Sequence, residues 1–462
     1  MPGISEPPIQ EILNLENASV KPRILSCASP VPGHTAPVLR VSEALSKRGY
    51  DVTMIAGIEY FDAIKKFGGR PVEIEPMMTA EAMGARAKVP PGPEQLAFDM
   101  STFFIKPTKV RMECVYATLE KMNEEDPESQ IVIVTESFFL GTHPMYLGAP
   151  LPKGFTKRPR VINLHALAYF VKSVDTGPIG MGLLPDPTPE GREKMAALRH
   201  DAMHGEWSHL LDMDEENMRS LGAVNYRRDI LWELWQTTHD LTLQMCPPSL
   251  EYARPDWHPK VQFVGALPAK PAKADQVYPP FWDEITSGQK RVVVVSQGTI
   301  ATEYHQLILP TLKGLADRDD LLVVALLGVK GASLPSDIEV PSNVRVLDYF
   351  PYDVLLPHAS VFVFNAGYGG FIHGAINGVP MVLAGISEEK PEAAARGEYC
   401  GVAVNLRTSE PSVQQVTDAI NRVLTEPSFK KKAAKVKAEN EAMSATDAVE
   451  SAVLKMAALG YA

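Results

Sequence analysis

Hydrophobic and polar positions in the first half of the chain alternate between buried strands and an amphipathic helix. An apolar run at 22–29 is followed by a Pro/Gly loop and then by apolar residues at helical spacing, ending at Gly49. A second apolar run occupies 51–57, and runs at 130–139 and 158–166 have the length of buried strands. This order predicts the opening of a doubly wound α/β domain.

A proline-rich stretch at 266–281 separates this half from a second series of the same kind. The stretch has little periodicity, which is typical of an interdomain linker. Five apolar runs with the length of strands follow it, at 290–300, 320–328, 343–350, 360–367 and 379–385. The chain beyond about 411 has a helical pattern.

The pattern as a whole predicts an α/β protein of two Rossmann-like, doubly wound domains that face each other across a cleft. We expect an N-terminal domain at 1–265, the linker at 266–281, a C-terminal domain at 282–440 and a C-terminal helix at 441–462. Two segments of the first half, 79–105 and 166–220, are rich in Met, Phe, Pro and Gly and lack a regular strand-helix alternation. We interpret them as loops and helices around a pocket mouth.

Composition narrows the class of protein. The 462 residues are 45% hydrophobic and 22% charged, which is ordinary for a globular protein with large cores. The net charge of −11 argues against a nucleic-acid partner. Four widely spaced cysteines predict reduced thiols. The acidic N-terminus does not resemble a secretory signal, and no apolar run reaches membrane-spanning length, so we expect a cytoplasmic protein without a transmembrane segment.

Glycine-rich loops follow two of the expected strands in the second half. One is Ser296–Thr299, which comes after four consecutive valines, and the other is Asn365–Gly370. Such loops bring backbone N–H groups and a helix N-terminus to one point, which suits a diphosphate. Close packing of helix on strand would also require glycine there. Neither loop has the spacing of a dinucleotide-binding or P-loop motif.

The first half supplies a candidate acid-base pair. His34 lies on the loop after the first expected strand, where an imidazole can act as a general base. Glu136 lies at the carboxyl end of another expected strand, and strand ends of one parallel sheet share an edge. We therefore expect Glu136 to orient His34, although an isolated histidine is more often structural or simply exposed.

Two acidic tracts have competing interpretations. Asp212-Met213-Asp214 resembles the D-x-D of metal-dependent sugar transferases, but its acidic helical surroundings favour a solvated helix start. Glu388-Glu389-Lys390 lies between an expected strand and a helix. Its carboxylates could bind sugar hydroxyls, or they could simply favour the helix N-terminus.

Taken together, these motifs resemble the UDP-glycosyltransferase family of inverting enzymes with two Rossmann domains (the GT-B fold), in the variant common among fungal members. The resemblance spans about 22–460 and is strongest over 290–406. PVPGHTAP matches P-x-x-G-H-x-x-P, which implies that His34 is the catalytic base. VTESFF matches the strand end that usually carries an Asp partner, and here the residue is Glu136.

The donor signature of the family is present with substitutions. DYFPYDVLLPHA resembles the uracil-binding segment, and FNAGYGGFIHGAINGVP fits H-x-G-W-N-S-x-x-E, with Asn365 in place of the phosphate-binding His. Gly370 then replaces the Ser and His373 the ribose-binding Glu, while Tyr352 replaces the usual Gln beside uracil. The resemblance implies that UDP is bound by Gly298, Thr299, Tyr349, Phe350, Tyr352, Asn365, Gly367, Gly369, Gly370 and His373.

EEKPEAAAR resembles D-[QK]-P-x-x-A-x-R, which implies that Glu389 and Lys390 lie beside the donor sugar. The similarity extends to fungal glucosyltransferases that build glycolipids such as sophorolipids, and it implies a C-terminal helix that returns to the first domain. The expected reaction is metal-independent, inverting transfer of a hexose, with glucose as the expected sugar and no cofactor. The apolar segments 95–105 and 163–185 suggest a lipid, polyketide, steroid or phenol acceptor. A sugar-nucleotide epimerase and a non-catalytic lipid or nucleotide carrier stay as alternatives.

Overall fold

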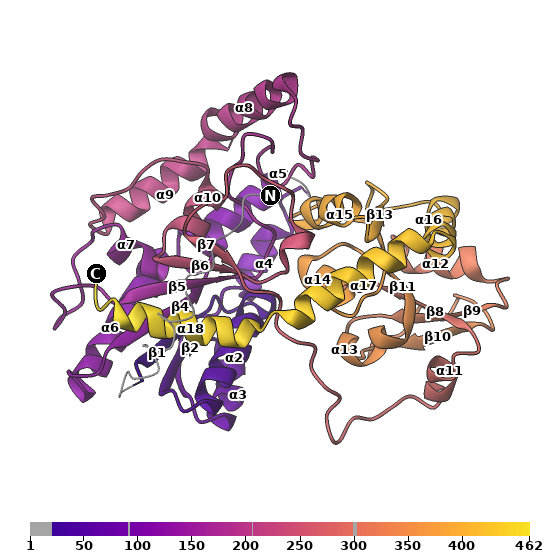
Figure 1. Cartoon of the computed structure of the whole chain (residues 1–462), viewed down its shortest axis with the longest axis horizontal. Helices are drawn as coiled ribbons and strands as arrows, with labels where there is room; N and C mark the ends of the chain where they lie inside the picture. The colour runs from indigo at the N-terminus through magenta and orange to yellow at the C-terminus, as the bar shows by residue number, and fades with distance from the viewer. Residues whose placement is uncertain (1–20, 91–92, 206, 299–302) are drawn as a thin grey trace.

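Two parallel β-sheets organise the chain in the computed structural model, which describes residues 21–90, 93–205, 207–298 and 303–462 (Figure 1). Within this part of the chain, the first sheet has seven strands in the order β3-β2-β1-β4-β5-β6-β7 and the second has six in the order β10-β9-β8-β11-β12-β13. Every strand pair in both sheets is parallel. The prediction of two Rossmann-like α/β domains is confirmed.

The strands of the first sheet are β1 Arg23–Cys27, β2 Val52–Ala56, β3 Arg70–Glu73, β4 Ile131–Glu136, β5 Arg160–His165, β6 Leu241–Gln244 and β7 Val261–Phe263. Those of the second are β8 Arg291–Ser296, β9 Leu321–Leu326, β10 Val344–Leu347, β11 Ala359–Phe364, β12 Met381–Leu383 and β13 Ala403–Asn405. The central strands β1, β4 and β9 are buried along their whole length, because helices cover both faces of a doubly wound sheet.

Helices of the first domain are α2 Pro32–Lys47, α3 Phe61–Lys66, α4 Ala80–Arg86, α5 Pro93–Asp99, α6 Thr108–Glu125, α7 His143–Tyr146, α8 Pro189–His204, α9 Ser208–Ser220 and α10 Leu231–Thr237. Those after the linker are α11 Trp282–Thr286, α12 Ile308–Leu315, α13 Tyr352–Leu355, α14 Tyr368–Ile376, α15 Lys390–Tyr399, α16 Val413–Thr425, α17 Pro427–Ala442 and α18 Ala445–Ala458. No helix in the described ranges is long and apolar enough to cross a membrane.

The start of α2 corrects the position expected for His34. The sequence places this histidine on a loop, but α2 begins at Pro32 and includes His34 in its first turn. Proline is favourable at the first positions of a helix, because its fixed φ suits the helix and its missing N–H would have no intrahelical partner there. The imidazole is therefore held by a helix end.

The C-terminal helix α18 leaves the second domain and packs on the first. Val449, Val453 and Met456 are buried in the same core cluster as α2 and β4. On its exposed side, Arg48, which directly follows α2, pairs with Asp447 and Glu450, each at 2.5 Å. Figure 1 shows α17 along the second domain and α18 across the first, so the end of the chain fastens the two domains together.

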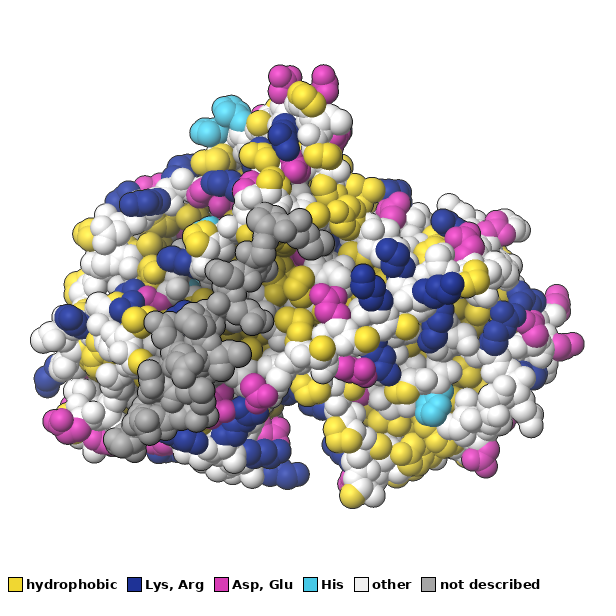
Figure 2. All heavy atoms as spheres, viewed as in Figure 1, with side chains coloured by type: hydrophobic (Ala, Val, Ile, Leu, Met, Phe, Trp, Pro, Cys, Tyr) yellow, Lys and Arg dark blue, Asp and Glu magenta, His cyan; other side chains and the backbone are white. Residues whose placement is uncertain are grey.

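The linker is tied to both domains. Arg40 of α2 donates a hydrogen bond to the carbonyl of Pro268. The backbone N–H of Lys270 donates to Asp353 Oδ2 of α13 at 2.7 Å. In the space-filling view the two lobes separate at the lower edge, where the surface is indented (Figure 2).

Candidate functional site

The acid-base pair is assembled at the carboxyl ends of β1 and β4. These strands are neighbours, with Cys27 of β1 opposite Thr135 of β4. Glu136 is the last residue of β4, and His34 follows β1 in the first turn of α2. Parallel register therefore brings together two side chains that are 102 positions apart in the sequence.

The side chains of His34 and Glu136 are hydrogen-bonded to each other. His34 Nδ1 lies 2.9 Å from Glu136 Oε2. The same carboxylate accepts the backbone N–H groups of Phe138, at 2.8 Å, and Ser29, at 3.3 Å. Glu136 is 5% exposed. Burial opposes its ionisation, but the positive charge and hydrogen bond of His34, with the two amides, outweigh burial and lower the carboxyl pKa to about 2.

An ionised Glu136 fixes the proton of the imidazole on Nδ1. The other ring nitrogen, Nε2, is then the basic one. The His34 side chain is 20% exposed, so the pair is partly open to a ligand. This is the arrangement that a general base requires.

Aromatic rings enclose the histidine. The centroid of the His34 ring lies 5.1 Å from that of Phe138 and 5.6 Å from that of Phe104. Phe104 lies in a π-helical turn at Met100–Ile105. Such turns are rare in proteins, and those that occur are often found at functional sites. Phe138 in turn packs against Trp235 at 5.2 Å. These rings exclude water from one side of the imidazole.

Much of the apolar segment 95–105 is core. Met100, Phe103, Phe104 and Ile105 are buried in a cluster with α9 and α10. The partly buried hydrophobic residues of the same segment are Leu96, Ala97 and Phe98. The segment thus supplies mainly the support of the aromatic wall, and the acceptor class stays a prediction.

The ion pair leads to a pH prediction. The folded pKa of Glu136, about 2, lies below its ordinary value of 4.5, so its ionisation stabilises the fold above pH 4.5. That stabilisation, about 3 kcal/mol for a depression of this size, is lost as the pH falls from 4.5 towards 2. We expect the free energy of unfolding of Glu136→Gln to lie below that of the native chain at pH 6 and to approach it at pH 3, by urea titration.

The control for this experiment is Glu128→Gln, which alters an exposed carboxylate in a turn. It should show no such pH-dependent difference. A difference between Glu136→Gln and the native chain that stayed constant from pH 6 to pH 3 would contradict an ionised Glu136.

The two glycine loops of the second domain meet at the ends of β8 and β11. Asn365 Nδ2 donates to the carbonyl of Gln297 at 2.5 Å, which fastens one loop to the other. Gly298 has a φ of 81° and Ala366 a φ of 63°, so both loops turn sharply through left-handed backbone. Thr299, predicted to contact the diphosphate, lies outside the described residues.

The glycines of the second loop have different roles. A Cβ on Gly370 would meet the Phe364 ring at 2.6 Å, so this glycine is required for the packing of α14 on β11. A Cβ on Gly369 would meet no atom within 4 Å. Gly367 precedes the first residue of α14. Gly367 and Gly369 therefore leave backbone open to a ligand at the helix N-terminus, whereas packing alone accounts for Gly370.

The predicted uracil segment exposes one ring and buries another. Tyr349 is 46% exposed, whereas Phe350 is buried against Trp282, with ring centroids 5.3 Å apart. Tyr352 turns its hydroxyl towards β8 and donates to Ser296 Oγ at 2.9 Å. Tyr349 is thus the ring available for stacking, and Phe350 can contribute only through its backbone.

His373 has a partner that the sequence did not indicate. Its Nδ1 lies 2.6 Å from Asp353 Oδ1. Burial opposes ionisation of Asp353, but the hydrogen bond and charge of His373 outweigh it and lower the carboxyl pKa. The other oxygen of Asp353 accepts the linker amide of Lys270. The predicted ribose-binding residue is therefore tied to the linker.

Glu389 and Lys390 lie at the start of α15, close to the second glycine loop. Glu389 Oε1 accepts the backbone N–H of Tyr368 at 3.2 Å, so its carboxylate sits at the N-terminus of α14. Lys390 Nζ contacts Glu388 and donates to Ser387 Oγ at 3.2 Å. Glu388 also reaches the first domain, with Oε1 3.7 Å from Nη2 of Arg86.

The D-x-D tract is helical and Asp212 is exposed, as expected, but the prediction of a solvated helix start was wrong for Asp214. Asp212 and Asp214 lie in the middle of α9. Asp212 pairs with Arg228 at 2.6 Å. Asp214 is buried and accepts a hydrogen bond from Tyr226 at 2.9 Å, and burial raises its pKa to about 7. In the described ranges no group of three or more His, Cys, Asp or Glu side chains is arranged to hold a metal ion.

Comparison with known proteins identifies relatives over the full length. The chain is 48% identical to UDP-glucosyltransferase 1 of Beauveria bassiana (strain ARSEF 2860), covering 99% of both proteins. It is 36% identical to UDP-glucosyltransferase B1 of Starmerella bombicola, covering 95% of this chain and 99% of the relative. The family model for the Erythromycin biosynthesis protein CIII-like, C-terminal domain, matches residues 310–456.

A solved structure, the glycosyltransferase of kitacinnamycin, superimposes with a TM-score of 0.67 at 18% sequence identity. The match covers 93% of this chain and 98% of that structure. At this identity the likeness concerns the fold alone, which is the GT-B arrangement of two Rossmann-like domains.

Proposed function

The chain belongs to the family of UDP-glycosyltransferases, and from this premise we propose that it transfers glucose, with inversion, from UDP-glucose to a hydroxyl of an apolar acceptor. Its activity as a UDP-dependent glycosyltransferase follows from the full-length relatives. Both relatives are named glucosyltransferases, which supports glucose as the donor sugar. The observation that carries the mechanism is the hydrogen bond between His34 and the ionised Glu136.

In the proposed mechanism, His34 Nε2 accepts the proton of the acceptor hydroxyl. The hydroxyl oxygen attacks the anomeric carbon of the sugar from the face opposite UDP, and the bond between that carbon and the diphosphate oxygen breaks. Glu136, which holds the Nδ1 proton, stabilises the imidazolium that forms. A single displacement inverts the configuration.

We propose that the leaving diphosphate is stabilised by the second domain. The N-terminus of α14, with Gly367 and Gly369, would direct backbone N–H groups at the diphosphate. Gly298 and Asn365 would complete the phosphate site, and Tyr349 would stack on uracil. Fixed amides and a helix dipole supply the charge stabilisation without a metal ion or a cofactor.

Two further contacts are proposed for the sugar moieties of the donor. His373, oriented by Asp353, would bind the ribose hydroxyls. Glu389 and Lys390 would contact the hydroxyls of glucose at the start of α15. On the acceptor side, the partly buried apolar residues near the aromatic wall support a lipid, polyketide, steroid or phenol acceptor. Cytoplasmic location stays a prediction.

The test is a UDP-release assay with purified protein and EDTA, using UDP-glucose and a panel of hydroxy fatty acids, steroids and phenols. We expect acceptor-dependent release and a product heavier by one hexose, with an anomeric configuration opposite to that of the donor by NMR. Release that required added metal would contradict metal independence. UDP binding without release from any UDP-sugar would favour a carrier, and conversion of the sugar nucleotide without an acceptor would favour an epimerase.

A further inference from the structure

A loop at residues 166–183, here called the acceptor-side loop, runs from the aromatic wall of the first domain to a helix of the second. It begins directly after β5, the neighbour of β4 in the sheet. The ring centroid of Phe170 lies 6.2 Å from that of Phe138, which itself packs on His34. The start of the loop therefore supports the wall beside the proposed base.

The far end of the loop is docked on α15. The backbone N–H groups of Gly180 and Gly182 both donate to Glu392 Oε1, at 2.8 and 2.9 Å. Gly182 has a φ of 59°, and a Cβ there would meet the carbonyl oxygen of Pro391 at 2.9 Å. Glu392 is 5% exposed. Glycine is thus needed for the loop to approach α15 this closely, and a buried carboxylate holds it there.

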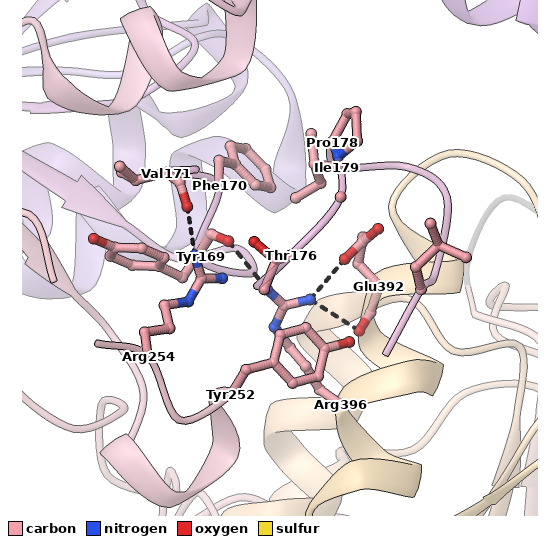
Figure 3. Close-up of a pocket in the computed structure, with 12 residues that line it drawn as sticks. Tyr169, Phe170, Val171, Thr176, Pro178, Ile179, Tyr252, Arg254, Glu392 and Arg396 are labelled. Atoms are coloured by element: carbon pink, nitrogen blue, oxygen red, sulfur yellow. Dashed lines mark hydrogen bonds and ion pairs between the residues drawn. The ribbon is translucent and has the colours of Figure 1, made fainter. Parts of the chain in front are cut away.

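A buried ion-pair network joins this end of the loop to its beginning. Arg396 Nη1 lies 2.8 Å from Glu392 Oε2, and Arg396 Nη2 donates to the carbonyl of Tyr169 at 3.0 Å. Arg396 Nε lies 2.7 Å from Glu251 Oε2, and the other oxygen of Glu251 accepts the N–H of Tyr169 at 2.8 Å. Figure 3 shows Arg396 between Glu392 and the loop. One guanidinium thus holds both ends of the loop.

Glu392 is also one helical turn from the proposed sugar contacts. Glu389 and Lys390 lie at the start of α15. The loop is therefore docked on the same helix end that carries these two residues. We infer that Glu392, braced by Arg396, is a positioning residue that fixes the acceptor-side loop relative to the donor sugar and so promotes acceptor binding and excludes water. This inference rests on the proposed function.

The decisive variant is Glu392→Ala, which releases Gly180 and Gly182 and leaves Arg396 held by Glu251. We expect the KM for the acceptor to rise by roughly tenfold, the effect of losing a charge-assisted hydrogen bond, and the Kd for UDP to stay unchanged. We also expect more of the UDP to be released with free glucose, because water replaces the acceptor hydroxyl as the nucleophile. Unchanged acceptor KM and unchanged glucose release would overturn the inference.

Matched variants separate loop docking from loss of charge. Gly182→Ala alters no charge but clashes with Pro391, and we expect it to reproduce the effect of Glu392→Ala. Gly180→Ala is the control for backbone strain: its φ of 98° is less favourable to Ala than the 59° of Gly182, but its Cβ would meet no atom within 4 Å of it. Glu398→Gln neutralises another carboxylate of α15, the partly exposed partner of Arg407, and should behave like the native enzyme. An acceptor KM of Gly182→Ala that matched that of the native enzyme would contradict docking on α15.

Hydrogen exchange tests the same link without turnover. We expect UDP-glucose, compared with UDP, to slow amide exchange in peptides covering 176–183 of the native chain, and Glu392→Ala to abolish this difference. Faster exchange in Glu392→Ala with normal acceptor KM would reduce Glu392 to a merely structural role. Failure of the native chain to transfer sugar from any UDP-sugar would contradict the proposed function. The difference in amide exchange between UDP-glucose and UDP would still test the link between the donor sugar and the loop, because it does not require turnover.

Discussion

Replacement of His34 by Ala should lower acceptor-dependent turnover by about 100-fold or more, the typical scale for the loss of a general base. Without the imidazole, the acceptor hydroxyl must lose its proton to water while its oxygen attacks the sugar. UDP binding should be retained, because the proposed donor contacts all lie in the second domain, in the segments that follow β8, β10, β11 and β12. The measurement is steady-state UDP release, with the Kd for UDP from calorimetry.

Because His34 is hydrogen-bonded to Glu136, substitution of Glu136 tests the same role of His34. Glu136→Gln should also lower turnover, because an amide neither stabilises the imidazolium nor requires the proton to lie on Nδ1. The double variant should be little worse than His34→Ala, since residues that act as a unit are non-additive. His200→Ala, which alters an exposed histidine of α8, is the control. Near-native turnover of a folded His34→Ala enzyme would contradict the base role.

The strands that lie within an unbroken apolar run could be predicted from the sequence, whereas short, partly exposed strands outside such runs could not. Strands such as β4 and β9 are buried on both faces and therefore appear as unbroken apolar runs. β3, β7 and β13 have only three or four residues and are partly exposed, so they carry too little pattern to be distinguished from a loop. The missing strands extend the edges of the sheets and leave the central order intact.

In the candidate site, residues at strand ends could be predicted from the sequence, whereas most of their tertiary contacts could not. His34 and Glu136 could be paired because parallel strands end at a common edge. The amides of Ser29 and Phe138 that also hold Glu136 could not be predicted, because every residue but proline has such a group. Packing also separates the glycines by role. Gly370 is required because a side chain there would clash with the Phe364 ring, and this could be determined only from the structure.

The sequence spacing indicates only one of the two ion pairs that Arg396 makes. Glu392 and Arg396 are four residues apart, the spacing at which side chains meet on one face of a helix. Their third member, Glu251, is 145 positions from Arg396 and belongs to the other domain. The spacing alone is that of any surface ion pair, and burial between domains is what makes this one important.

Arg396→Met should lower the free energy of unfolding by about 3–5 kcal/mol, as expected when one partner of a buried ion pair is removed. The side chains of Arg396 and Glu251 are 1% and 0% exposed, so Glu251 would remain as a buried, uncompensated charge together with Glu392. The Tyr169 carbonyl would also lose its donor. Urea unfolding at pH 7 measures the loss, with Arg407→Met as the control, because Arg407 is exposed and pairs with Glu398 of the same helix.

The physical cause can be isolated by neutralising the carboxylates as well. Combining Arg396→Met with Glu251→Gln and Glu392→Gln removes both buried charges, while the amide oxygens still accept the N–H groups of Tyr169 and of Gly180 and Gly182. We expect this triple variant to be more stable than Arg396→Met alone, because the cost of the single substitution lies mainly in unpaired buried charge. If Arg396→Met lost no more stability than Arg407→Met, the network would not hold the domains together.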